Sequence, residues 1–228
     1  MTTETTPPSE TTPPSTEFRK FGAMLVGKAI VLFARFITAA QTKWVGIEPV
    51  PAQRVYYANH TSNGDFVLIW TALPIRLRDQ TRPVAGSDYW LSSKFRAFIG
   101  REVFNAVLID RNPDTRDHDP MERIIEAVDE GDSLIIFPEG TRNMTGEKLL
   151  PFKSGIYNLA LARPEVDLVP VWIENLNNVM PKGEIVPIPL ICTVTFGAPV
   201  HLKEGEDRKV FLQRAADALS ALSEEETK

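Results

Sequence analysis

Cysteine is almost absent from this sequence. Among 228 residues there is one cysteine, Cys192, so no disulfide can form within the chain and no cluster of thiolates can hold a metal ion. A chain without disulfides fits a reducing, cytosolic environment. Cys192 lies in an apolar stretch, and we expect it to be a buried and unreactive thiol.

Long uncharged runs are missing from the apolar N-terminal region. Residues 17–45 contain no stretch of about 18 uncharged residues, which disfavours a transmembrane span there. The N-terminus also lacks the succession of basic residues, apolar run and cleavage site that marks a signal peptide. Residues 1–16 consist of Thr, Pro, Ser and Glu after the initiator Met, and we expect this polar, proline-rich segment to be a disordered tail. Residues 224–228 are expected to be frayed.

An excess of positive charge is missing as well. The chain has 25 basic and 30 acidic residues, a formal net charge of −5. This argues against nucleic acid as a partner, because a phosphate backbone favours a basic surface. The charge is unevenly distributed, since residues 19–45 carry five basic residues and no acidic one.

Residues 17–45 have the pattern of a cationic amphipathic helix. Apolar residues recur at steps of three and four, at Val26, Ile30, Phe33, Ile37, Ala40 and Trp44. Basic residues recur along the other side, at Lys20, Lys28, Arg35 and Lys43. Such a helix can lie in the headgroup region of a membrane with its cations against anionic lipid, or it can pack its stripe on its own domain. Further apolar residues widen the surface and favour membrane contact: Phe18, Phe21, Leu25, Leu32 and Phe36.

Short apolar runs alternate with helical patterns over residues 46–223. The expected strands are residues 54–59, 82–86, 106–110, 133–137, 168–173 and 190–196. The expected helices are residues 65–73, 121–130, 154–163 and 207–223. This alternation predicts a single α/β domain with a mainly parallel, mixed sheet flanked by helices. A chain of this length has room for one good core.

The first segment that carries chemistry is Asn-His-Thr-Ser-Asn-Gly-Asp, residues 59–65. It joins an expected strand to an expected helix, at an edge where open α/β sheets bind ligands. With Ser62 or Asn63 as the helix cap, His60 and Asp65 can meet. A carboxylate bonded to one ring nitrogen fixes the tautomer and leaves the other nitrogen free to accept a proton from an alcohol. A histidine and an aspartate at this spacing also occur in purely structural turns.

The second segment is Phe-Pro-Glu-Gly-Thr-Arg-Asn, residues 137–143. It follows an expected strand, so its glycine-containing turn offers backbone N–H groups and Arg142 at the same kind of edge. These are the elements of a phosphate-binding turn. Arg142 can equally pair with Glu139 in a structural turn, and the residues alone leave both possibilities open.

Together the two segments resemble the glycerolipid acyltransferase family, in particular the lysophosphatidic acid (1-acylglycerol-3-phosphate) acyltransferases, whose hallmark is NHxSxxD followed downstream by FPEGTR. Residues 107–111, Val-Leu-Ile-Asp-Arg, resemble the family's block that ends in Asp-Arg. Residues 168–171, Leu-Val-Pro-Val, resemble its final apolar block with proline. One departure is Gly64, where the family often has a bulkier side chain, and this leaves room for a different acceptor headgroup.

The resemblance implies a role for each matching residue. His60 is expected to act as the general base, and Asp65 is expected to orient it. The residues expected to bind the acceptor are Arg111, Glu139, Gly140, Thr141, Arg142 and Lys153. The family also implies an α/β fold with an N-terminal helical membrane-contact element, no metal and no cofactor, with acyl-CoA or acyl carrier protein as the thioester co-substrate.

The implied reaction is direct acyl transfer: the acceptor hydroxyl, deprotonated by His60, attacks the thioester and the carrier thiol leaves. The expected partners are a lysophospholipid acceptor, the carrier and a membrane surface with anionic lipid, and the expected location is peripheral or monotopic on the cytoplasmic face. Two other functions stay open. A lipid-directed serine hydrolase would use Ser62 or Ser154, although the Gly-x-Ser-x-Gly pattern is absent. A lipid-binding module would keep the fold without turnover.

Overall fold

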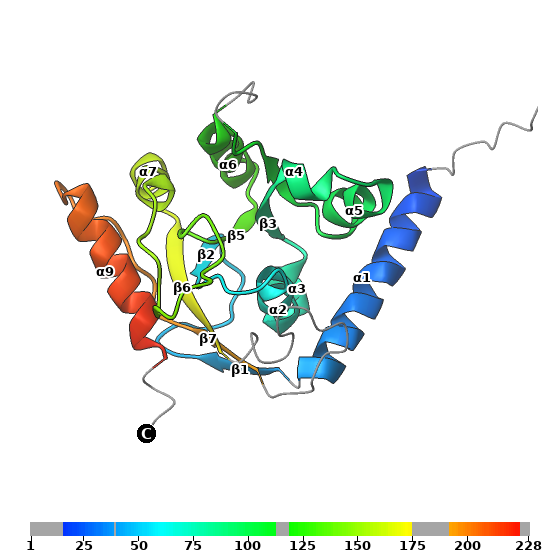
Figure 1. Ribbon diagram of the computed structural model, residues 1–228, viewed down its shortest axis with the longest axis horizontal. Helices are drawn as coiled ribbons and strands as arrows, with labels where there is room; N and C mark the ends of the chain where they lie inside the picture. Colours follow the sequence, from blue (N-terminus) through cyan, green and yellow to red (C-terminus); the bar gives the residue numbers. More distant parts are fainter. Residues whose placement is uncertain (1–15, 39, 113–118, 175–191, 224–228) are drawn as a thin grey trace, which may run out of the picture.

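The computed structural model describes residues 16–38, 40–112, 119–174 and 192–223. The expected tails at residues 1–15 and 224–228 lie outside this part of the chain, as do residues 190 and 191 of the last expected strand. A seven-stranded sheet forms the centre of the molecule, with helices on both of its faces (Figure 1). The prediction of a single α/β domain with a mainly parallel sheet is confirmed.

The strands follow the order β1-β7-β6-β2-β5-β3-β4 across the sheet. Their bounds are β1 Gln41–Trp44, β2 Arg54–Ala58, β3 Thr81–Gly86, β4 Val107–Ile109, β5 Ser133–Ile136, β6 Asp167–Glu174 and β7 Thr193–Phe196. Neighbouring strands are parallel, except for the antiparallel pair of β6 and β7. Every residue of the central strand β2 is buried, as expected of a parallel strand covered on both faces.

Two helical layers bury the two faces of the sheet. The helices after α1 are α2 Asp65–Ala72, α3 Ile75–Arg78, α4 Ser87–Trp90, α5 Lys94–Phe98, the π-helical turn η1 Ile99–Val103, α6 Pro120–Asp129, α7 Gly155–Ala162 and α9 Arg208–Ala221. On one face α6, α7 and α9 pack against side chains such as Tyr57 and Ile136. On the other face α2 and α3 pack against alternate residues of the same strands, such as Tyr56 and Ile135. The alternation follows from the two-residue period of a strand.

The N-terminal helix is shorter than the sequence predicts. Helix α1 (Thr16–Thr38) begins at the last residue of the expected tail and ends well before residue 45. Residues Gln41–Trp44 instead form β1, which pairs with β7, and the Trp44 ring stacks on Phe196 with ring centroids 4.1 Å apart. The apolar spacing that seemed to continue the helix therefore includes a strand, because pairing with a distant segment decides its conformation. The domain begins at β1, before residue 46.

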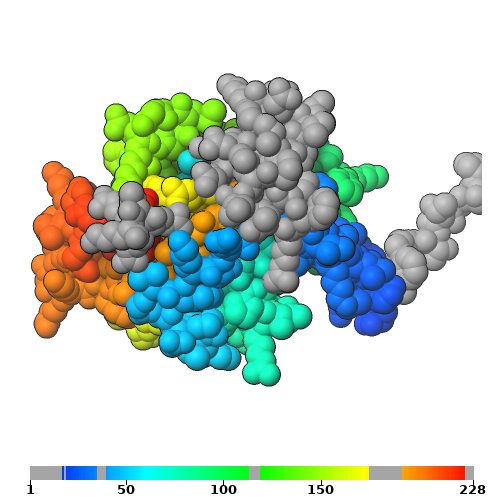
Figure 2. All heavy atoms as spheres, turned by 90° about the horizontal axis from the view of Figure 1, so that it is seen from below, coloured from blue at the N-terminus to red at the C-terminus, as the bar shows by residue number. Residues whose placement is uncertain are grey.

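Helix α1 has a packed face and an exposed face. Its small residues Ala23 and Gly27 are buried, and the side chains of Val103 and Trp70 approach the Gly27 backbone. The large apolar side chains that point outward are 45% to 72% exposed: Phe21, Met24, Leu25, Leu32 and Phe33. Figure 2 shows α1 as a dark blue ridge at one end of the molecule and α9, in orange, at the other. None of the helices in the described residues is long and apolar enough to span a membrane.

Candidate active site

The two sequence motifs meet because they follow neighbouring parallel strands. In the β2–β5 pair, Tyr57 lies opposite Ile136, so the loop after β2 and the loop after β5 leave the sheet at the same edge. Strand β3 runs parallel beside β5, and β4 runs parallel beside β3, so Gly86 and Arg111 come to that edge too. Open α/β sheets bind their ligands at the carboxyl ends of the strands.

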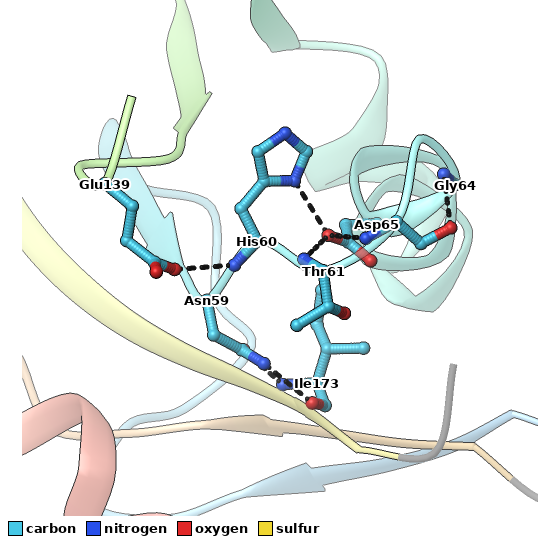
Figure 3. A network of polar contacts seen from close by, with 8 residues as sticks. Asn59, His60, Thr61, Gly64, Asp65, Glu139 and Ile173 are labelled. Atoms are coloured by element: carbon cyan, nitrogen blue, oxygen red, sulfur yellow. Dashed lines mark hydrogen bonds and ion pairs between the residues drawn. The ribbon is translucent and has the colours of Figure 1, made fainter. Parts of the chain in front are cut away.

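His60 and Asp65 form the hydrogen bond that the sequence predicts. The Nδ1 atom of His60 lies 2.8 Å from Oδ2 of Asp65, and the carboxylate is completely buried at the first residue of α2. The same oxygen accepts hydrogen bonds from the backbone N–H groups of Thr61 at 2.6 Å and Ser62 at 2.9 Å. A carboxylate acceptor assigns the proton to Nδ1 and leaves Nε2 with a free lone pair. Figure 3 shows this second nitrogen pointing away from the network.

The helix start differs from the prediction that Ser62 or Asn63 caps it. Gly64 is the N-cap of α2, without a side-chain cap bond. The Ser62 hydroxyl accepts a hydrogen bond from the Gly64 N–H at 3.2 Å, and the Asp65 carboxylate satisfies the amides of the preceding turn. Asp65 therefore fixes the loop and the histidine ring together, a double role that its position in the first helical turn makes possible.

The loop after β5 holds the backbone of His60 from both sides. The His60 N–H donates to Oε1 of Glu139 at 2.8 Å (Figure 3), and the His60 carbonyl accepts from the Asn143 N–H at 2.6 Å. The Phe137 ring stacks on the imidazole with ring centroids 4.2 Å apart and planes 19° apart. Backbone and ring are both fixed, so Nε2 has a defined direction before any ligand binds.

Glu139 serves a different purpose from the one expected. Its second oxygen, Oε2, accepts a hydrogen bond from the Leu150 N–H at 2.8 Å, and the residue is 2% exposed. Burial raises the pKa of Glu139, while the two backbone hydrogen bonds act in the opposite direction. The carboxylate connects three stretches of backbone, so its expected role in the acceptor site is not supported; nor does it pair with Arg142.

His60 opens onto a cleft of about 260 Å³. Its walls come from the ends of β3, β4 and β5 and from α2, α4, α6 and α7, and most of its lining residues are apolar. The polar and charged side chains of the lining are His60, Asn63, Tyr89, Trp90, Arg111 and Lys153. An apolar cleft with a few convergent polar groups is the usual form of a small-molecule site.

Arg111 and Lys153 reach the cleft because two glycines leave room for them. A Cβ atom on Gly86 would lie 2.7 Å from Nη2 of Arg111, and a Cβ on Gly140 would lie 2.8 Å from Cδ of Lys153. Gly140 also has φ +71°, a left-handed conformation that glycine adopts without strain. Nη2 of Arg111 lies 3.2 Å from both carboxylate oxygens of Asp88, an exposed pair of the kind that contributes little stability.

Comparison with known proteins shows the family of the chain. A family model described as Acyltransferase matches residues 41–174, which is more than half of the chain. The chain belongs to the acyltransferase family. The match begins at the first residue of β1, in agreement with the domain boundary in the structure.

Curated members of the acyltransferase family that resemble the chain are named 1-acyl-sn-glycerol-3-phosphate acyltransferase. A protein from Cocos nucifera is 27% identical over 76% of this chain and 57% of its own length. The chloroplastic protein BAT2 from Brassica napus is 31% identical over 60% of this chain and 38% of its own length. The Escherichia coli K12 protein is 29% identical over 54% of this chain and 48% of its own length. The chain thus spans about half the length of these relatives.

A solved structure shares the fold. It is the 1-acyl-sn-glycerophosphate (LPA) acyltransferase PlsC from Thermotoga maritima, with a TM-score of 0.68 over 93% of this chain and 87% of that one. The sequences are 22% identical, so this likeness establishes the fold alone.

The structure gathers some of the residues that the acyltransferase motifs single out and separates others. His60, Arg111, Gly140 and Lys153 line one cleft. Thr141 and Arg142 are exposed on the loop beside Gly140 and do not belong to the lining. Their part in acceptor binding stays a prediction.

Two supporting residues escaped sequence reasoning. The Asn59 side chain donates to the Ile173 carbonyl at 2.9 Å and accepts from its N–H at 2.8 Å, which extends the contact between β2 and β6 up to the histidine. The buried Asn143 donates to the Glu147 carbonyl and shapes the loop that holds His60. Asn59 is the first residue of the NHxSxxD motif and Asn143 directly follows FPEGTR. Their partners are backbone atoms, distant for Asn59 and local for Asn143, and the sequence does not identify these.

Proposed function

We propose that the protein transfers a fatty acyl group from a thioester, acyl-CoA or acyl carrier protein, to the free hydroxyl of 1-acylglycerol-3-phosphate and so forms phosphatidic acid. One observation carries the proposal. The imidazole of His60 is oriented by a buried carboxylate and presents a free nitrogen to a cleft that also contains Arg111 and Lys153. The names of the curated relatives support this acceptor.

The geometry suits general-base catalysis of alcohol attack. Nε2 of His60 takes the proton of the acceptor hydroxyl as its oxygen adds to the thioester carbonyl. Asp65 stabilises the positive charge that develops on the ring, because its carboxylate contacts the opposite nitrogen. The tetrahedral intermediate then expels the carrier thiolate, which receives the proton from His60. General-base assistance of this kind contributes roughly 10²- to 10⁴-fold in rate.

The two cations of the cleft suit the phosphate of the acceptor. Arg111 can exchange its exposed partner Asp88 for a phosphate, which binds a guanidinium through two oxygens. Lys153 lies against Gly140, on the loop that also holds His60. Phosphate bound between these side chains would place the acceptor in the cleft that contains the general base.

The arrangement of serines does not favour a hydrolase. A serine hydrolase needs its nucleophile within hydrogen-bond reach of the histidine. The Ser62 hydroxyl bonds to the Gly64 N–H instead, and among the described residues neither Ser62 nor Ser154 has a hydrogen bond to His60. A serine-directed phosphonate should therefore leave the protein unlabelled.

We further propose that the protein is peripheral or monotopic on the cytoplasmic face of a membrane, with the exposed face of α1 against anionic lipid. Phe21, Leu25 and Leu32 follow one another at helical spacing, and exposed Lys28 lies in the same row. Large apolar side chains next to a cation are the composition of a helix that lies in the headgroup region.

A panel assay tests the proposal. The purified protein is incubated with several lyso-lipids and with palmitoyl-CoA or palmitoyl-acyl carrier protein, and products are identified by mass. We expect phosphatidic acid from 1-acylglycerol-3-phosphate, and no product with His60→Ala. Release of free fatty acid without acyl transfer would contradict the proposal, as would lipid binding without any turnover.

A further inference from the structure

A second hollow, of about 610 Å³, lies along the outer strand of the sheet. All three residues of β4, Val107–Ile109, belong to its lining. Ser87 of α4 and Arg101 of η1 contribute to the lining as well, and so does α6 from Pro120 to its C-cap residue Glu130. Helices α4 and α6 both lie at this end of the sheet (Figure 1). We call this hollow the β4 groove.

The outer edge of β4 has no partner strand among the described residues. β4 is the last strand in the order of the sheet and pairs with β3 alone among the described strands. An edge strand presents backbone N–H and C=O groups that a further strand can pair with. An extended segment of polypeptide can therefore add to β4 through main-chain hydrogen bonds.

The charged residues of the β4 groove balance one another. The lining contains three arginines and three acidic residues: Arg82, Arg101, Arg123, Asp110, Glu126 and Glu130. A ligand of high charge of either sign is therefore disfavoured. A mostly uncharged segment with hydroxyl groups suits this lining, because a hydroxyl can donate to a carboxylate and accept from a guanidinium.

The first turn of α1 lies next to the β4 groove. Helix α1 begins at Thr16, and Nη2 of Arg19 lies 2.9 Å from Oε1 of Glu102 in η1. Glu102 directly follows Arg101, which belongs to the lining of the groove. Residues 1–15 therefore join the domain close to the groove.

Residues 2–6, Thr-Thr-Glu-Thr-Thr, have the composition of a short strand. Threonine is β-branched and favours extended backbone, and Pro7 restricts the residue before it to extended conformations. The segment carries hydroxyl groups and a single carboxylate, in keeping with a groove of balanced charge.

Residues 7–15 are long enough to bring this segment to β4. Nine extended residues span roughly 30 Å, and the prolines among them favour an extended chain. Val107, the first residue of β4, follows Glu102 by five residues, which is a distance of at most about 18 Å. The connection therefore spans the path from α1 to β4 with length to spare.

We infer that residues 2–6 bind in the β4 groove as an added strand and cover the free edge of β4. Their backbone pairs with the outer edge of the strand, and their hydroxyl groups bond to the charged side chains on either side. An uncovered edge strand can pair with a second copy of the chain, so the bound segment keeps copies apart. The inference is independent of the proposed function.

Hydrogen–deuterium exchange of the full chain tests the inference. Exchange of the peptide that contains β4 is measured by mass spectrometry in wild type and in Glu4→Pro/Thr5→Pro, at a concentration at which every protein is monomeric. Two adjacent prolines remove N–H donors from both sides of an added strand. The matched control is Glu10→Pro/Thr11→Pro, which changes the same two residue types within the connecting residues 7–15. We expect exchange at β4 to be about 10-fold or more faster in Glu4→Pro/Thr5→Pro and unchanged in the control, because a bound segment slows exchange in proportion to its occupancy.

Other outcomes would overturn the inference. Equal exchange in the three proteins would show that residues 2–6 do not bind in the β4 groove. Faster exchange in the control alone would assign the groove to the connecting residues instead. Protection of β4 that persists in Glu4→Pro/Thr5→Pro and grows with protein concentration, together with a dimer in analytical ultracentrifugation, would assign the groove to a second copy of the chain. Dimerisation of Glu4→Pro/Thr5→Pro at a concentration at which wild type and control stay monomeric would support the inference, because it shows that the edge has been uncovered.

Discussion

Replacing Asp65 with asparagine separates the geometry of the active site from its charge. Oδ2 of Asp65 accepts three hydrogen bonds, from the His60 ring and from the Thr61 and Ser62 amides, whereas Oδ1 is buried and has no hydrogen-bond partner among the described residues. An asparagine therefore keeps all three bonds if its oxygen takes the Oδ2 position and its NH₂ takes the other. The histidine keeps its position and tautomer but loses the negative charge beside Nδ1.

The size of the expected effect follows from the ion pair that would form between His60 and Asp65 in the proposed reaction. When His60 accepts the proton, a positive ring stands in direct contact with the Asp65 carboxylate. Two unit charges about 4 Å apart attract each other by about 4 kcal/mol at an effective dielectric constant near 20. At 1.36 kcal/mol for each factor of ten, we expect kcat to fall about 10³-fold. The acceptor KM should change little, because Asp65 does not line the cleft.

The assay is a double-mutant cycle in acyl transfer, with Asp65→Asn, His60→Ala and the double variant. If Asp65 acts through the histidine, Asp65→Asn has no further effect on kcat in the His60→Ala background. Thermal unfolding of each variant checks that the domain stays folded. The reasoning would be refuted by a fall in kcat of less than about threefold, or by an equal fall in both backgrounds.

Three further predictions concern the glycine-containing turn after β5, the stability of the fold at low pH and the membrane contact of α1. Gly140 has φ +71°, and Gly140→Ala places a Cβ atom against the Lys153 side chain. The acceptor KM should therefore rise more than the donor KM. An equal rise in both would show that this loop is not part of the acceptor site. The Arg214 guanidinium lowers the pKa of Glu206 from 4.5 to about 2, so this pair stabilises the fold above pH 4.5 and is lost as the pH falls towards 2. Urea titrations at pH 5 and pH 2.5 should show that Glu206→Gln loses less free energy of unfolding than wild type; equal losses would contradict the assignment. Replacing Phe21, Leu25 and Leu32 of α1 with serine should lower the affinity for anionic vesicles, measured by co-sedimentation, about 10-fold or more. Unchanged co-sedimentation would limit α1 to packing on the domain.

The sequence pattern predicted the correct element where the spacing of apolar residues and the flanking residues indicated the same element. The predicted strands at residues 54–59 and 133–137 differ from β2 and β5 by one residue at most. The predicted helix at residues 65–73 closely matches α2. These elements bury most of their side chains against the two faces of the sheet, so the composition of each segment reflects its environment directly.

The sequence pattern predicted the wrong element where pairing with a distant segment decided the conformation. Residues Gln41–Trp44 carry an apolar spacing compatible with a helix, but they complete the sheet beside β7. The short helices α3, α4 and α5 were not predicted, because each has only four or five residues and too short a pattern to be recognised.

The amino-acid sequence was enough to identify the candidate site: a histidine and an aspartate five residues apart, a glycine-containing turn after a second strand, and motifs that resemble those of one enzyme family. These depend on residue types at short spacing, which local geometry preserves. Which of these residues share a cleft follows from the fold. The parallel pairing of β2 with β5 brings Glu139 and Asn143 to the His60 backbone, whereas the course of the loop leaves Arg142 exposed. Strand order and loop conformation depend on contacts between segments far apart in the chain, and these contacts leave no local signature in the sequence.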